Sequence, residues 1–155
     1  MTDLTKAVVF RIDEQRYALP VAAVERIVRA AEVAPLPGAP SIVLGALRVE
    51  DRILPVLNIR RRFGLPEREI TPADHFLIGH TGARRFVLVI DEPLDVIEAH
   101  PSAIIAANEI VLGLEHVQGV AILDDGLIVI HDLQKFLSVD EAHSLEEAMA
   151  SRNDA

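Results

Sequence analysis

Short runs of apolar residues, each bounded by a polar turn, recur along most of the chain. Val and Ile dominate these runs, and their branched side chains favour extended backbone. Runs of this length between turn signals are typical of β-strands joined in hairpins. The pattern predicts paired strands at 7–12 with 16–19, 42–49 with 53–59, 76–80 with 85–90, and 118–123 with 127–131.

Proline and glycine mark the places where regular structure should stop. The segment 35–40 (PLPGAP) contains three prolines and a glycine. Because proline lacks a backbone donor and keeps its predecessor extended, we expect an irregular crossing there. Pro93 precedes the strand expected at 94–98, which indicates an edge strand or a bulge. The segment 100–116 shows no clear period and gives no prediction.

A few short segments favour helix. Residues 21–28 are expected to form a helical turn followed by a strand, and residues 133–137 a second turn. A third turn, 58–63, should end at Gly64, since glycine is the usual residue just past a helix end.

The C-terminal segment contains a serine three residues before a glutamate twice, at Ser138 and at Ser144. This spacing is the capping box, in which the two side chains satisfy backbone donors at a helix start. We expect a short acidic helix within 139–149.

Many short strands at close spacing favour an all-β fold, a barrel or a sandwich, over alternating strands and helices. The 155 residues fit one domain, 1–155, whose ends 1–6 and 152–155 should fray. Two hairpin-rich halves divided near 68–74 are expected within it.

Composition narrows the function. The net charge of −9 argues against nucleic acid, whose phosphates require clustered Lys and Arg, and against insertion into an anionic membrane. No apolar run approaches the roughly 20 residues of a membrane span, and no apolar signal core follows the N-terminus. Without cysteine, thiolate chemistry is excluded. These features predict a cytoplasmic protein.

The polar residues do not converge on a catalytic pattern. His131 and Asp132 are adjacent, and neighbours on a strand point to opposite faces, so they do not form a dyad. No histidine pair has metal-ligand spacing, and no serine elbow or phosphate loop is present. The arginine run 60–62 is expected to be a solvated face. We predict no catalytic residue, no metal and no cofactor; a small hydrolase or metalloprotein is the least favoured alternative.

The segment 35–66 resembles the CheW-like family in its proline-rich crossing, in Gly45, in Pro55-Val56 and in the basic helical turn from Asn58. The resemblance extends to both sides, over roughly 7–137. Its quoted segments are the opening hairpin 10–28, the middle strands 86–104 with Asp91 and Asp95, and the closing hairpin with its helix, 117–137.

This resemblance implies two packed five-stranded β-barrels around an apolar core, with short helical turns and a C-terminal helix. It also implies an adaptor that joins the cytoplasmic tips of chemoreceptors to the regulatory domain of a CheA-type histidine kinase. In the family, the receptor lies in a groove between the barrels, and the kinase packs at barrel ends. The alternative is a diverged module that serves a non-flagellar chemosensory system or another partner through the same surfaces.

Family positions also suggest partner-binding residues. Those expected at or near the receptor groove are Val24, Phe86, Ile90 and Val96, and the alternative is that all four belong to the core.

The family's four-residue signature NLRG falls on 48–51, so that Glu50 stands where the arginine is usual. The acidic residue that faces this arginine corresponds to Arg26. We therefore predict an ion pair of exchanged polarity, with the two side chains within about 4 Å of each other on the partner surface.

Overall fold

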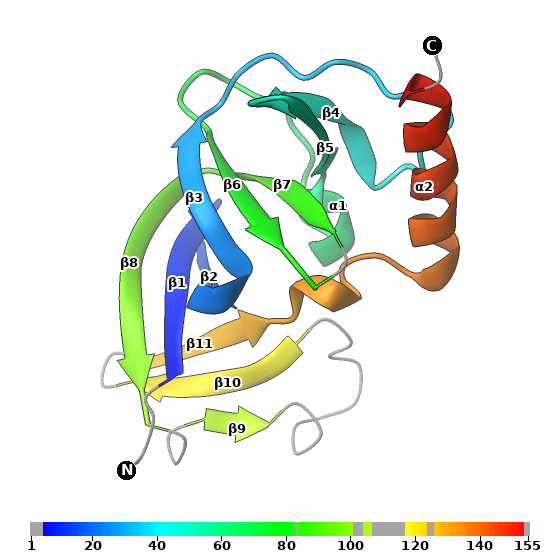
Figure 1. Cartoon of the computed structure of the whole chain (residues 1–155). Coiled ribbons are helices and arrows are strands. Elements are labelled where there is room, and N and C mark those ends of the chain that lie inside the picture. Colours follow the sequence, from blue (N-terminus) through cyan, green and yellow to red (C-terminus); the bar gives the residue numbers. More distant parts are fainter. Residues whose placement is uncertain (1–4, 83, 101–103, 107–116, 124–125, 154–155) are drawn as a thin grey trace.

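The computed structural model describes residues 5–82, 84–100, 104–106, 117–123 and 126–153, and its strands form two sheets (Figure 1). The first sheet has the order β8-β1-β2-β11-β10-β9. Its strands are β1 (Thr5–Ile12), β2 (Gln15–Pro20), β8 (Glu92–Ala99), β9 (Ile104–Ala106), β10 (Val117–Leu123) and β11 (Gly126–His131).

The second sheet has the order β3-β6-β7-β5-β4 and lies between β2 and β8 in the sequence. Its strands are β3 (Val24–Arg29), β4 (Val43–Val49), β5 (Arg52–Leu57), β6 (His75–His80) and β7 (Arg85–Ile90). The predicted all-β class and all four predicted hairpins are confirmed. The first sheet contains one strand more than the five expected, the three-residue β9.

The predicted division of the chain near 68–74 is wrong, because β5 before this segment and β6 after it belong to the same sheet. Each sheet is completed by a parallel pairing between strands distant in sequence, β5 with β7 and β2 with β11. Hairpin signals report only neighbouring strands, so they cannot reveal these pairings.

The short helices lie where the sequence placed them. A 3-10 turn, Val21–Ala23, precedes β3, and another, Leu133–Lys135, follows β11. Helix α1 (Ile59–Phe63) begins at Asn58, whose side chain accepts a hydrogen bond from the Arg61 backbone, and ends at Gly64 with φ 71°. A left-handed residue at this position favours glycine, which explains the sharp stop.

The C-terminal helix α2 (Val139–Asn153) begins with the predicted capping box. The Glu141 backbone donates to Ser138 Oγ at 3.1 Å, and the Ser138 backbone donates to Glu141 Oε1 at 2.9 Å. Ser144 lies inside α2 and does not begin a helix, because the capping box at Ser138 already begins this one. The helix extends beyond the expected 139–149 and includes 152 and 153, whose fraying stays a prediction.

Among the described residues, three apolar cores hold the structure together. One lies inside each sheet, and the third, the shared core, lies between the sheets. Alternate residues of β7 point to different cores: Val87 enters the interior of the second sheet, while Phe86 and Leu88 enter the shared core. Helix α2 covers the shared core with Leu145 and Ala148.

The predicted irregularity at Pro93 is confirmed. Strand β8 is the end strand of the first sheet, and a register shift separates the pairs Val9 with Asp95 and Phe10 with Pro93. Leu94 is thus the extra residue of a bulge. An end strand of a sheet suits Pro93, because proline has no backbone hydrogen to donate to a further strand.

The chain lies very close to the outer edge of β4 just before the proline-rich segment, at Val33 and Ala34. Ala34 and Ala46 exchange backbone hydrogen bonds of 3.0 and 2.8 Å. A Cβ on Gly45 would lie 2.2 Å from the Ala34 carbonyl oxygen and 2.7 Å from Val33 Cγ1. Only glycine lets this part of the chain approach the strand so closely.

Gly45→Ala should therefore lower the free energy of unfolding by about 2–3 kcal/mol, because the backbone must shift to admit the methyl group. Chemical denaturation measures this value. Gly82→Ala is the matched control, since a Cβ there meets nothing within 4 Å, and its effect should stay within about 0.5 kcal/mol. Equal effects of both changes would contradict the close-approach explanation.

Candidate partner-binding site

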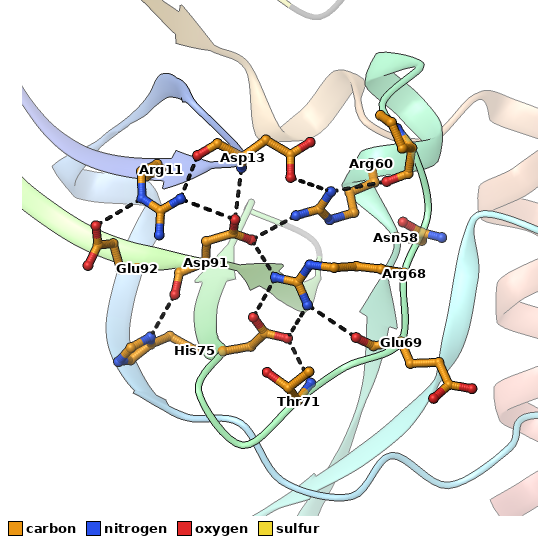
Figure 2. Close-up of polar contacts among 12 residues, drawn as sticks. Arg11, Asp13, Asn58, Arg60, Arg68, Glu69, Thr71, His75, Asp91 and Glu92 are labelled. Carbon is orange, nitrogen blue, oxygen red and sulfur yellow. Dashed lines mark hydrogen bonds and ion pairs between the residues drawn. The ribbon is translucent and has the colours of Figure 1, made fainter.

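A partly buried ion cluster joins the two sheets where the chain passes from β7 to β8 (Figure 2). Arg60 lies in α1, which follows β5 of the second sheet, and has only 8% of its surface exposed. Its guanidinium lies 2.9 Å from Asp91 Oδ1 and 2.8 Å from Asp13 Oδ1, in the β1–β2 turn of the first sheet. The expectation that the arginine run is a solvated face is wrong for Arg60, since carboxylates distant in sequence surround it.

Asp91 also binds the next member of the ion cluster, Arg68, at 2.9 Å. Arg68 in turn makes two hydrogen bonds, of 2.7 and 2.8 Å, to the buried carboxylate of Asp74. The remaining Asp91 oxygen accepts the Asp13 backbone N–H at 2.8 Å. The ion cluster, Asp13, Arg60, Arg68, Asp74 and Asp91, thus contains three carboxylates and two guanidinium groups. Arg11 supplies a third guanidinium, 3.4 Å from Asp91 Oδ2.

The surroundings of Asp74 favour its ionised form. Burial by itself would raise the pKa of Asp74, but hydrogen bonds from Arg68 and from the Thr71 backbone lower it below its ordinary value. The hydrogen bonds that Arg68 donates to Asp74 in turn raise the pKa of Arg68. Arg68 therefore faces a carboxylate that stays charged at lower pH than an exposed aspartate does.

A small groove lies where the ends of the two sheets meet. Its lining comes from the end of β2 with the 3-10 turn after it, from the end of β6 with the turn after it, and from the two residues after β11. These residues are Pro20, Ala22, Ala23, His80, Thr81, Gly82, Asp132 and Leu133. This inter-sheet groove has a volume of about 260 Å³. That size suits a few side chains of a protein partner better than a cofactor.

The four apolar residues expected at this groove occupy different environments. Phe86 and Ile90 are 5% and 0% exposed and belong to the shared core, as the alternative interpretation proposed. Val24 is half-buried against the same core, directly after the groove residue Ala23. Val96 is 54% exposed on β8 and is not among the residues that line the groove. Partner contact at Val24 and Val96 stays a prediction.

The predicted approach of Arg26 and Glu50 is confirmed at a distance of 3.4 Å between Nη2 and Oε1. Arg26 lies on β3, and Glu50 lies in the turn directly after β4. The pair therefore connects β3 and β4, the two end strands of the second sheet. The sheet must curve strongly to bring them together, as a barrel does. Both side chains are exposed and available to a partner.

A second ion pair lies near the first, close enough for the charge of Arg26 to help lower the pKa of Glu25. Arg85 of β7 binds both carboxylate oxygens of Glu25 at 3.0 and 2.8 Å. This hydrogen bond from Arg85 is the main reason why the pKa of Glu25 lies below its ordinary value. Arg26 with Glu50 and Arg85 with Glu25 are thus two neighbouring ion pairs.

His131, which is adjacent to Asp132 in the sequence, is enclosed by aromatic rings. The ring of His131 is buried among Tyr17, Phe63 and Phe136, with ring centroids 4.7–6.2 Å away. Among the described residues, no group of three or more His, Cys, Asp or Glu is placed to hold a metal. In the same part of the chain, no helix is long and apolar enough to cross a membrane.

Residues 6–141 match the family model described as the CheW-like domain. The chain belongs to the CheW-like family. It is 26% identical to the chemotaxis protein CheW of Treponema pallidum over 144 residues, which cover 89% of this chain and 85% of that protein. The match to CheW of Bacillus subtilis is 31% over 104 residues, 67% of each chain.

The fold agrees with a solved relative. The crystal structure of scaffolding protein TtCheW from Thermoanaerobacter tengcongensis superposes with a TM-score of 0.80 at 25% identity, covering 91% of this chain and 96% of that one. The predicted family is confirmed, and these relatives support the predicted adaptor role. The ion cluster escaped the sequence analysis, although the family resemblance had pointed to Asp91.

The ion cluster predicts an unequal effect of two neighbouring carboxylates. Asp91→Ala should cost about 3 kcal/mol of unfolding free energy, because Arg60 and Arg68 would lose a shared, buried partner. Glu92→Ala should cost less than about 1 kcal/mol, since Glu92 is exposed and pairs with Arg11 at the surface. Urea denaturation measures the free energy of unfolding of both variants. Similar losses in Asp91→Ala and Glu92→Ala would show that the ion cluster does not stabilise the joint between the sheets.

Proposed function

We propose that this chain is a non-catalytic cytoplasmic adaptor that couples a chemoreceptor's cytoplasmic tip to the regulatory domain of a CheA-type histidine kinase. The observation that carries the proposal is the inter-sheet groove with the Arg26–Glu50 pair on the adjoining strand. Membership of a family with chemotaxis and scaffolding relatives supports the same role.

The receptor helix would lie across the inter-sheet groove. Ala22, Ala23 and Leu133 offer small and aliphatic surfaces, and Val24 continues them along β3. Burial of such surface contributes about 25 cal/mol per Å² and supplies affinity, while polar residues at the rim set the register. A helix seated in an apolar groove is a common way to recognise a peptide segment.

Val96 suits a different contact. Its exposed side chain lies on the end strand β8, next to the exposed Leu94. We assign this strand to the second partner, the kinase regulatory domain, because one adaptor must bind two proteins without overlap.

The charge pair determines which partner fits. In the family signature the arginine occupies the position of Glu50, so this chain presents the opposite polarity to an approaching receptor. Like charges brought together at an interface cost several kcal/mol and exclude the wrong partner. A receptor complementary to the usual polarity should bind poorly, whereas the chain's own receptor should carry the exchanged charges.

The double change Arg26→Glu with Glu50→Arg should strengthen binding to a receptor tip of usual polarity by about tenfold, more than either single change. The melting temperature should hardly move, since an exposed pair contributes only about 0–1 kcal/mol. Fluorescence anisotropy with a labelled receptor hairpin measures the affinity. The matched control exchanges Lys6 and Glu98, an exposed ion pair between β1 and β8 that does not line the inter-sheet groove, and should leave receptor binding nearly unchanged.

If the double change does not improve binding, the polarity argument fails. A chain that binds neither its own receptor tip nor its own kinase domain would favour the alternative. That alternative is a diverged CheW-like module for a non-flagellar system or another partner. The exchanged polarity of the Arg26–Glu50 pair is the observation that keeps it open.

A further inference from the structure

A second groove, the outer groove, lies over β4 of the second sheet, and neither Arg26 nor Glu50 lines it. It has a volume of about 860 Å³ and runs between two irregular segments, 30–35 and 66–72, over β4. Hydrogen bonds hold both segments in place: Ala34 bridges to Ala46, and Asp74 accepts the Thr71 backbone. The outer groove is therefore a preformed feature of the surface.

The floor of the outer groove is apolar. Leu44 of β4 is 41% exposed there, although leucine is among the residues most often buried. Val33, Ile70 and Pro72 line the groove around it. An exposed leucine between aliphatic neighbours in a concave surface offers hydrophobic free energy to a partner.

The rim of the outer groove carries uncompensated negative charge. Glu32 and Glu69 line it and are exposed, and within the described ranges neither side chain has an ion-pair partner. The adjacent cation, Arg68, is already bound by Asp74 and Asp91. A positive group entering the groove would therefore meet carboxylates without competition from a nearby arginine.

We propose that the outer groove docks a basic, aliphatic segment of a partner protein. Aliphatic side chains of this segment would cover Leu44, and its Lys or Arg side chains would pair with Glu32 and Glu69. A second copy of this chain fits poorly, because the net charge is −9 and the exposed Leu94 and Val96 lie among carboxylates of β8. Charge complementarity thus favours a basic partner.

The test uses the full chain and two synthetic amphipathic peptides of equal length, one of leucine and lysine, the other of leucine and glutamate. The lysine peptide should bind in an isothermal titration, while the glutamate peptide should not. In methyl NMR spectra, the lysine peptide should shift the signals of Leu44, Val33 and Ile70. Glu32→Lys with Glu69→Lys should weaken its binding by at least about tenfold.

General attraction between opposite charges is the competing explanation. The control variant Glu14→Lys with Glu147→Lys changes the net charge by the same amount at two exposed positions outside the outer groove. It should weaken binding less than about twofold. Equal weakening in both variants, methyl shifts elsewhere, or no binding by the unmodified chain would each overturn the proposal. The proposal concerns a site separate from the receptor groove, so its failure leaves the proposed function untouched.

Discussion

Arg60 and Asp91 are opposite charges paired at 2.9 Å where little solvent reaches either side chain. Both side chains are about nine-tenths buried, and removal of either would leave an uncompensated charge in a region of low dielectric constant. Asp13 and Arg68 complete their coordination (Figure 2). These groups come from the first sheet's opening turn, from α1 and from the link between β7 and β8, so the pairing fixes the sheets relative to each other.

The shared core depends on the same arrangement. Strands β1, β2, β6 and β7 are buried on both faces, one towards a sheet interior and one towards the other sheet. A slip of one residue in any of them would exchange two sets of apolar side chains between cores of different shape. The inter-sheet groove lies at the margin of this core, and hence its width is set by the packing below it. A scaffold needs that rigidity to present two partners in a constant orientation.

Local signals in the sequence were sufficient wherever a few neighbouring residues determine the structure. Asn58 and Gly64 bound α1, Ser138 with Glu141 starts α2, and Pro93 marks the bulged end strand. The polarity of the Arg26–Glu50 pair also followed from the sequence, because the resemblance to the family supplied the register of two segments 24 residues apart.

Features that arise from distant contacts were not predictable in this way. Arg60 belongs to a run of three arginines that reads as a solvated face, and its carboxylate Asp91 lies 31 residues away. The sequence of β7 is apolar on both faces of the strand, and it does not show which face meets a groove. Phe86 and Ile90 were therefore equally consistent with the core and with a partner surface. The outer groove likewise forms from two irregular segments with no sequence period.

If the ion cluster and the shared core make the two sheets one rigid unit, the sheets should open together. Native-state hydrogen exchange, measured at increasing denaturant concentration, reports the opening free energy of each amide. The slowest amides of β1 and β2 and those of β6 and β7 should open with the same free energy, equal to that of global unfolding. Amides of one sheet that open several kcal/mol more easily than those of the other would instead show that the sheets are separate units.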